Sequence, residues 1–215
     1  MVLICAIDEA GRGPVIGPMV MAGILVDEKD LSKLRYIGVK DSKELTPKQR
    51  EFLFKEITKI VKDYRILIIP PKEIDDALNS QELNLNRLEA IKIALIINKL
   101  KPDKVIFDCP STNPKNYINY LRLFLKDKEL EIDAGHKYDT KFIEVGAASI
   151  LAKVTRDLQI KKIQNHIKEN IGSGYASDPY TIKFLKENYK NYPEIIRKTW
   201  STYKKINNQK NLDEF

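Results

Sequence analysis

Short apolar runs separated by turns and charged residues mark the first two thirds of the chain. The runs Val2–Ile7 and Met19–Val26 have the length of buried strands and are too short to span a membrane. Glycine and proline lie between them, so these two strands are expected to form a long hairpin. Further strands are predicted at Arg65–Ile69, Lys104–Cys109 and Leu130–Ala134.

Helical periodicity appears between the strands and continues alone after them. Thr46 provides an N-cap and Pro47 a first helical residue for a helix reaching about Val61, whose apolar face is Phe52, Ile57, Ile60 and Val61. The other predicted helices are Glu73–Leu78, Asn84–Leu100 (apolar face Leu88, Ile91, Leu95 and Ile96), Asn116–Leu125, Val145–His166, Thr181–Tyr189 and Glu194–Ile206. This order predicts a mixed sheet covered by helices, followed by a helical part that begins near Gly172.

Charge and cysteine content narrow the class of protein. The formal net charge is +7 over 215 residues, which favours a polyanionic partner, nucleic acid first. Cys5 and Cys109, the only cysteines, lie in apolar runs, which predicts buried free thiols and a reducing, cytoplasmic location. The N-terminus lacks the basic start of a secretory signal, and lysines interrupt the apolar stretch Ala90–Leu100. No membrane association is expected.

Acidic residues follow two of the predicted strands. Asp8 and Glu9 come after the first strand, and Asp108 comes at the end of the fourth. If these strands are neighbours, their acids meet at one edge of the sheet, where α/β proteins bind ligands. A fourth acid is expected nearby, and the candidates are Asp133, Asp139 and Asp157.

A carboxylate cluster without a His/Cys group favours Mg²⁺ or Mn²⁺ over zinc. Two such ions can activate water and stabilise the leaving oxygen in phosphodiester cleavage. The loop after Glu9 adds glycine N–H groups and the guanidinium of Arg12, which suit a phosphate. The alternative is a polar hairpin turn whose charges are solvated, and each acid taken singly is also compatible with a surface position.

Longer blocks of sequence resemble a known family. Residues 8–14 (DEAGRGP) and 39–45 (VKDSKEL) are similar to archaeal type 2 ribonuclease H, ribonuclease HII. Asp108 and residues 136–139 (HKYD), 147–153 (AASILAK) and 172–179 (GSGYASDP) continue the match in the family's order. The resemblance implies an α/β fold, with a ribonuclease H-like mixed five-stranded sheet flanked by helices and a small helical C-terminal domain. It further implies a catalytic domain over 1–172, a helical substrate-binding region over 173–208 and a flexible tail over 209–215.

The resemblance also assigns the acids. It implies that the catalytic, metal-binding carboxylates are Asp8, Glu9, Asp108 and Asp139, with two Mg²⁺ or Mn²⁺ ions bound during catalysis. It therefore selects Asp139, which spacing alone does not distinguish from the other two candidates. Tyr138 stands where the family commonly has alanine, so this loop departs from the family pattern.

Substrate-binding roles are implied for two loops and a tyrosine. Gly11, Arg12 and Gly13 would read the ribose 2′-hydroxyl at an RNA–DNA junction, because only glycine lets a backbone approach a sugar so closely. Tyr175 would pack on the following deoxyribose, although an ordinary core or rim tyrosine is the alternative. Ser42 and Lys43 would bind backbone phosphate, although from sequence alone this segment is a helix-cap turn. The roles of Ser149, Lys153 and His136 stay open.

The implied activity is that of an endoribonuclease. It would cut the RNA strand of RNA–DNA hybrids, and single ribonucleotides in duplex DNA, leaving 3′-hydroxyl and 5′-phosphate ends. The chain would work as a monomer in DNA replication and repair. Two alternatives remain from the residues: a non-catalytic nucleic-acid-binding module with a structural metal site, and a metal-dependent phosphoesterase acting on small substrates.

The C-terminal segment is basic and aromatic. Its cations outnumber nearby acids and suit a duplex backbone: Lys183, Lys186, Lys190, Arg197, Lys198, Lys204 and Lys205. The interleaved aromatics, Tyr180, Tyr189, Tyr192, Trp200 and Tyr203, alternatively form a small helical core with the lysines outside.

The last seven residues, QKNLDEF, contain a short partner motif. Gln209, Leu212 and Phe215 have the spacing of segments that dock on the replication sliding clamp, where two apolar side chains fill a pocket. Such motifs usually carry two aromatics, and only one is present here. A disordered polar end is the alternative.

Overall fold

The computed structural model describes residues 1–213, and the side chains of residues 1–208. Its strands are β1 (Leu3–Ala10), β2 (Met19–Asp27), β3 (Asp63–Ile69), β4 (Lys104–Asp108) and β5 (Glu131–Gly135). They form one sheet in the order β3-β2-β1-β4-β5. β1 pairs antiparallel with β2 and parallel with β4, and β4 pairs parallel with β5. The predicted mixed five-stranded sheet and the long hairpin are confirmed.

The first strand is longer than expected. The apolar run Val2–Ile7 predicts the strand with Asp8 and Glu9 at its end, and β1 continues through both acids to Ala10. The antiparallel ladder explains the extension, since Asp8 pairs with Ala22 and Glu9 with Met21. The two acids therefore lie inside a strand, and their positions are fixed by backbone pairing.

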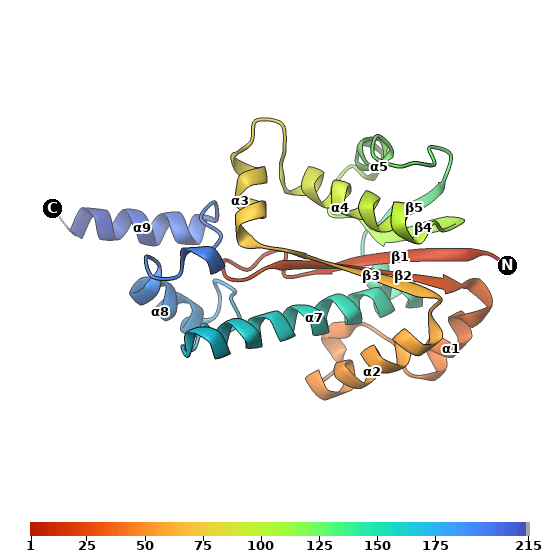
Figure 1. The fold of residues 1–215 in the computed structure, drawn as a ribbon, viewed down its shortest axis with the longest axis horizontal. Helices are drawn as coiled ribbons and strands as arrows, with labels where there is room; N and C mark the ends of the chain where they lie inside the picture. The colour runs from red at the N-terminus through yellow and green to blue at the C-terminus, as the bar shows by residue number, and fades with distance from the viewer. Residues whose placement is uncertain (214–215) are drawn as a thin grey trace. The chain divides into compact units, whose positions relative to one another are not determined.

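Helices cover both faces of the sheet. They are α1 (Leu31–Tyr36), α2 (Pro47–Ile60), α3 (Pro71–Asn79), α4 (Leu85–Leu100), α5 (Pro114–Arg122), α6 (Tyr138–Lys141), α7 (Ile143–Ile167), α8 (Pro179–Asn188) and α9 (Ser201–Asp213), with short 3₁₀ helices η1 (Glu28–Asp30), η2 (Ser42–Glu44) and η3 (Pro193–Ile195). Figure 1 shows α4 and α5 on one face of the sheet, and α1, α2 and the first part of α7 on the other. Among these, α1 and α6 were not predicted from the sequence.

The buried faces of the two helices agree with the prediction except at one residue in each. α2 begins with the predicted Thr46 cap, completed by Gln49 in a capping box, but Phe52 is 60% exposed and Leu53 is buried. In α4 Leu95 is 51% exposed, while Ile96 packs into space left by Gly23 of β2. Each misplaced residue stands next to a buried one, and successive helical residues point about 100° apart.

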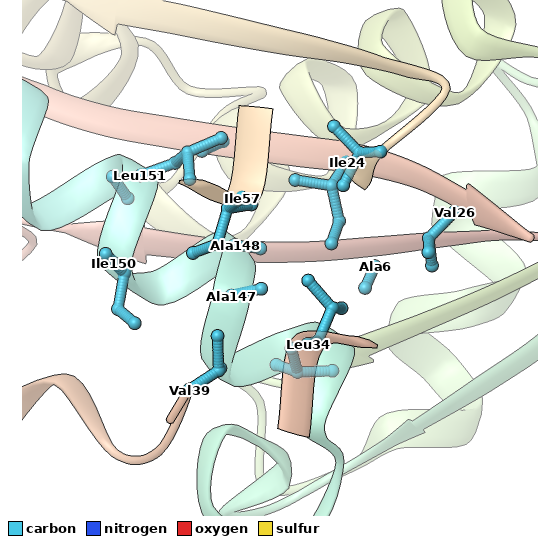
Figure 2. Close-up of a cluster of buried hydrophobic side chains, with 14 of the residues drawn as sticks. Ala6, Ile24, Val26, Leu34, Val39, Ile57, Ala147, Ala148, Ile150 and Leu151 are labelled. Atoms are coloured by element: carbon cyan, nitrogen blue, oxygen red, sulfur yellow. The ribbon is translucent and has the colours of Figure 1, made fainter. Parts of the chain in front are cut away.

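One hydrophobic cluster joins the sheet to the helices on the α7 face. β1 and β2 contribute Ala6 and Ile24, α2 contributes Ile57, and α7 contributes Ala147 and Ala148, all fully buried. Figure 2 shows these side chains together, with the small alanines of α7 against the sheet. Small side chains let a helix approach a sheet closely, so this packing fixes the N-terminal half of α7 against β1.

The chain divides into two compact units, and neither is continuous in sequence. The first contains residues 1–10, 20–67 and 86–155; the second contains 11–19, 68–85 and 156–215. The boundary near Gly172 stays a prediction; in the compact units, residues 11–19 and 68–85 group with residues 156–215. The second unit has its own apolar cluster, which includes Ile16, Phe184 and Ile196.

The predicted helix Glu194–Ile206 is wrong before Ser201 and right after it. Residues 193–195 form η3, α9 begins only at Ser201, and Ile196 is extended. The backbone there pairs with the loop after β1 instead: Ile16 and Ile196 form an antiparallel bridge, and Arg197 N–H donates to Val15 O at 2.9 Å. α9 then covers residues 209–213, where a flexible tail was expected. Phe215 of the clamp motif lies outside the described residues, as do the side chains of Gln209 and Leu212.

Both cysteines are buried free thiols, as predicted. No helix within residues 1–213 is long and apolar enough to cross a membrane.

Candidate active site

Three of the predicted acids converge in the first compact unit. β1 and β4 are adjacent and parallel, and Ile7 pairs with Phe107, so Asp8 and Asp108 occupy the next position on neighbouring strands. Asp139 lies on the short helix α6, which begins three residues after β5. The expectation that the acids of the first and fourth strands meet at one edge is confirmed for Asp8 and Asp108.

Asp8 is the most perturbed of these acids. Its side chain is buried, and this desolvation raises its pKa from 3.8 to about 7. The negative charges of Asp139 and Asp108 push this pKa in the same direction, while hydrogen bonds from Ser149 and from the Glu9 N–H oppose the rise. A buried carboxyl beside two further carboxylates is a site where a cation is favoured.

Glu9 leaves the strand on the other face. Successive side chains of a strand alternate between the two faces of a sheet, so Glu9 and Asp8 point to opposite sides of β1. The charge of Glu9 is among those that raise the pKa of the Cys109 thiol, after burial and Asp108. The structure therefore brings Asp8, Asp108 and Asp139 together and leaves Glu9 on the opposite face.

Asp108 is oriented by the segment that follows β5. The backbone N–H of Tyr138 donates to Asp108 Oδ1 at 2.8 Å. The Tyr138 hydroxyl donates to Asp133 Oδ1, also at 2.8 Å, so Asp133, one of the alternative fourth acids, is engaged by the tyrosine. Gly135 makes this possible, because a Cβ there would lie 2.5 Å from the tyrosine ring. Tyr138, which stands where the family commonly has alanine, thus fixes the loop in which it lies.

Asp139 is paired with a lysine from the 39–45 block. Lys43 Nζ donates to Asp139 Oδ2 at 3.0 Å, and this hydrogen bond raises the lysine pKa. The lysine side chain is 78% exposed and that of Asp139 only 12%. The predicted cap turn is present as well, since Asp41 Oδ1 accepts the Lys43 N–H at 2.9 Å.

Ser42 and Ser149 connect this turn to Asp8. Their hydroxyl oxygens are 3.0 Å apart, and Ser149 also hydrogen-bonds Asp8. The buried Arg50 of α2 supports the turn by donating to the Ser42 carbonyl at 2.9 Å. Ser149, whose role the sequence left open, therefore belongs to the acid cluster through α7. His136 is exposed, with Nδ1 3.2 Å from the Cys109 carbonyl.

The donor set suits a hard divalent cation. Within residues 1–208, no three His, Cys, Asp or Glu side chains already stand at metal-ligand positions. Asp108 and Asp139 are instead held by Tyr138 and Lys43. Burial, and then the charges of Asp139 and Asp108, raise the Asp8 pKa, and a bound cation would favour the ionised carboxylate; oxygen-only donors fit Mg²⁺ or Mn²⁺.

The glycine loop and Tyr175 are brought together in the second unit. Gly11 has φ +80°, and a Cβ there would lie 2.9 Å from both Arg156 Nε and Pro18 O. Gly13 faces Tyr175, since a Cβ added at Gly13 would lie 3.8 Å from the tyrosine Cε1. Tyr175 is 39% exposed and rests on the guanidinium of Arg156, which lies 5.4 Å from the ring centroid.

The burial of two arginines that contact this loop was not predicted from the sequence. Arg156 of α7 is 2% exposed, and Arg197 is fully buried. Arg197 was expected on the basic outer surface, which is wrong. The other cations predicted there are all exposed: Lys183, Lys186, Lys190, Lys198, Lys204 and Lys205. Most of the interleaved aromatics pack in or against the apolar cluster, whereas Tyr180 is 62% exposed.

Comparison with known proteins identifies the family. The family model described as ribonuclease HII matches residues 5–203. The chain belongs to the ribonuclease HII family. It is 46% identical to ribonuclease HII of Pyrococcus horikoshii over 99% of this chain and 98% of the relative. It is 49% identical to that of Thermococcus onnurineus over 94% and 89%.

Solved structures agree with this assignment. The crystal structure of ribonuclease H2 from P. horikoshii superposes with a TM-score of 0.87 at 46% identity, covering 96% of this chain and 98% of the other. Ribonuclease HII in a PCNA complex from Archaeoglobus fulgidus gives 0.83 at 37% identity, covering 93% and 96%. Ribonuclease HIII in complex with Mn²⁺ gives 0.79 at 19% identity over 97% and 70%, which shows the fold alone.

Family membership decides between the function classes that the sequence left open. As a ribonuclease HII, the chain is an enzyme, a ribonuclease H that hydrolyses RNA in RNA–DNA hybrids. A non-catalytic binding module and a small-substrate phosphoesterase are thereby set aside.

Proposed function

We propose that this chain cuts both the RNA strand of long RNA–DNA hybrids and single ribonucleotides embedded in duplex DNA. The observation that supports this most is buried Asp8, whose pKa is raised by burial and by the carboxylates of Asp139 and Asp108. A buried cluster of carboxylates lowers the stability of the fold. Its presence therefore indicates a functional role, here the binding of a cation and a phosphate. The glycine loop begins at Gly11, three residues after Asp8, so only Glu9 and Ala10 separate Asp8 from the loop in the chain.

Four carboxylates would hold the metal. Asp8, Asp108 and Asp139 would do so from one face of the sheet, and Glu9, the penultimate residue of β1, would reach the ions around the end of the strand. When bound, two Mg²⁺ or Mn²⁺ ions supply an activated water and stabilise the leaving 3′-oxygen, which gives 3′-hydroxyl and 5′-phosphate ends. Ser149 keeps Asp8 oriented through its hydrogen bond, and the Tyr138 N–H does the same for Asp108.

Lys43 has a second role in this proposal. Its hydrogen bond holds Asp139 in the metal-free protein, and its high exposure leaves the ammonium group within reach of solvent. A substrate phosphate would compete with Asp139 for the ammonium group of Lys43. The Asp139 carboxylate would then be released to the metal. Ser42 would contribute its hydroxyl to the same phosphate.

Selection of RNA is assigned to the glycine loop and Tyr175. Gly11, Arg12 and Gly13 offer backbone groups to a 2′-hydroxyl, the group that distinguishes RNA from DNA. The Tyr175 ring, supported from behind by Arg156, offers an exposed face for the neighbouring sugar.

Cleavage of a labelled DNA duplex with one ribonucleotide tests the proposal. With Mg²⁺ the wild-type chain is expected to cut on the 5′ side of the ribonucleotide, and EDTA should stop the reaction. The Asp8→Asn variant should lose at least about a thousandfold in rate, since it removes the central metal ligand. Asp157→Asn is the matched control: it removes an acid of α7 in the second unit and should keep normal activity. Cleavage retained by Asp8→Asn would contradict the assignment.

A sliding clamp is the second partner that we propose. The A. fulgidus structure contains ribonuclease HII together with PCNA, and its ribonuclease chain resembles this one along 93% of the length. The segment QKNLDEF carries a glutamine, a leucine three residues later and an aromatic six residues later. Replacing both Leu212 and Phe215 with alanine should abolish co-elution with an archaeal clamp in gel filtration, while cleavage of a short duplex stays at the wild-type rate. Co-elution by the double variant would rule out this motif.

A further inference from the structure

Arg197 makes a fork of hydrogen bonds to the glycine loop. Its side chain is fully buried in the second unit. Nη2 donates to the Gly11 carbonyl at 2.6 Å, Nη1 to the Arg12 carbonyl at 2.8 Å and Nε to the Gly17 carbonyl at 3.0 Å. One guanidinium therefore holds three carbonyls of the same loop, a pattern that the planar donor array of arginine permits.

Trp200 completes this arrangement. The guanidinium of Arg197 lies 4.9 Å from the Trp200 ring centroid, within cation–π range. The indole Nε1–H donates to the Gly13 carbonyl at 2.8 Å. The carbonyls of Gly11, Arg12 and Gly13 thus all point to two neighbouring side chains of the C-terminal segment.

The backbone around Arg197 is itself fixed on both sides. Gly17 N–H donates to the Ile195 carbonyl at 2.8 Å, and Arg197 N–H donates to Val15 at 2.9 Å. Asp75 of α3 accepts the N–H groups of Lys198 and Thr199 at 2.7 and 3.0 Å. The guanidinium is therefore presented from a rigid support.

Fixing the carbonyls also fixes the N–H groups of the loop. In a planar trans peptide, the C=O of one residue and the N–H of the next point in opposite directions. With the Gly11 and Arg12 carbonyls turned to Arg197, the N–H groups of Arg12 and Gly13 both face away from it. Successive N–H groups on one side of a loop form a concavity that binds an electronegative oxygen.

We propose that Arg197, together with Trp200, is a positioning residue that sets this loop for recognition of the ribose. The inference rests on the proposed role of Gly11, Arg12 and Gly13 in reading the 2′-hydroxyl. A plain core position is filled at least as well by an apolar side chain, because burial of a charge is costly. An arginine whose three donors match three loop carbonyls is instead suited to hold one backbone conformation.

Discrimination between two matched duplexes tests the proposal. Dissociation constants are measured in EDTA, by fluorescence anisotropy, for a DNA duplex with one ribonucleotide and for the same duplex without it. Trp200→Phe keeps the ring and removes the donor to Gly13, and Arg197→Met removes the fork at similar length. Both variants should lower the preference for the ribonucleotide about tenfold, while affinity for the all-DNA duplex is unchanged. Arg197→Lys should restore part of the preference, because it keeps the charge and one donor.

The tryptophan gives a second readout, since it is the only one in the chain. Its emission should change more on addition of the ribonucleotide duplex than of the all-DNA duplex. Phe184→Leu is the matched control for loss of stability, because Phe184 lies in the apolar cluster of the same unit. This variant should melt at a lower temperature and keep the wild-type preference.

Two results separate the failure of this inference from failure of the proposed function. An unchanged preference in Trp200→Phe and Arg197→Met, or an equal loss of affinity for both duplexes, would reduce Arg197 to a structural role. Gly11→Ala tests the loop itself, because φ +80° and the nearby Arg156 leave no room for a Cβ. If Gly11→Ala keeps the full preference, the loop does not read the ribose, and the proposed function fails at this point.

Discussion

Among single residues, Asp8 shows most clearly that the acid cluster lowers the stability of the metal-free fold. Its carboxyl is buried and lies near two other carboxylates, so the metal-free fold favours the protonated form. Ser149 and the Glu9 N–H offset only part of this cost, because the pKa still rises to about 7. An active site that must bind cations is expected to hold such unrelieved charge.

Asp8→Asn should therefore stabilise the metal-free protein at pH 8. The folded-state pKa of Asp8 lies above its unfolded value of 3.8, so its favourable contribution is complete below about pH 4 and is lost as pH rises through about 7. Asparagine stays neutral, and the variant should gain roughly 2–4 kcal/mol over wild type at pH 8, with little gain at pH 4. Thermal melting in EDTA at both pH values measures this difference.

Mg²⁺ provides the complementary control. It should raise the melting temperature of the wild type at pH 8 and leave Asp8→Asn nearly unchanged. An Asp8→Asn protein that melts below wild type at pH 8 in EDTA would show that Asp8 is satisfied without a metal.

Individual residues also mark the limit of what the sequence predicts. Asp8 and Asp108 were placed at one edge because each follows an apolar strand, and local patterns carry that information. Arg197 was misplaced because a lone arginine among lysines has no local signal. Its burial depends on a pairing between residues 15–17 and 195–197, far apart in the chain.

At the scale of elements, most helices lie where the sequence predicts them, apart from α1, α6 and residues 194–200, and each of the two predicted apolar faces has one exposed residue. The start of α2 follows from a local capping box at Thr46. The buried face of α4 depends instead on what it meets, and it meets Gly23, a position on another element. Periodicity within α4 places Ile96 on the apolar face, but it contains no information that the missing side chain at Gly23 makes room for it.

Gly23→Ala tests this contact. A Cβ at position 23 would clash with Ile96 Cγ2, so helix and strand must move apart. Overpacking of this kind costs about 1–3 kcal/mol of folding free energy. Urea unfolding of Gly23→Ala, Ile96→Ala and the double variant measures the coupling: Ile96→Ala removes the Cγ2 that the new Cβ would meet, so the double variant should be more stable than the sum of the single changes predicts. Strict additivity would mean that the two residues do not press on each other.

For the whole molecule, positive charge distinguishes binding of the duplex backbone from recognition of the ribose. The chain carries a net charge of +7, and the exposed lysines of α8 and α9 belong to the second compact unit. Phosphate contacts position a protein on a duplex without reading its sequence or sugar, and they depend on salt. The loop that is proposed to read the ribose lies in the same unit but consists of other residues. Mutations in that unit are therefore expected to change the affinity for the duplex backbone and the preference for the ribonucleotide separately.

Lys183→Gln combined with Lys186→Gln should weaken binding to the ribonucleotide duplex and the all-DNA duplex by the same factor. Both lysines are exposed and line one hollow of α8 with Ile182. Each lost phosphate contact should lower the slope of log affinity against log salt by about one. The double variant of Lys99 and Lys126, exposed lysines of the first unit, is the matched control for net charge and should keep the wild-type slope. Equal slopes in the two double variants would show that α8 makes no phosphate contact. A change in ribonucleotide preference would instead place these lysines in sugar recognition.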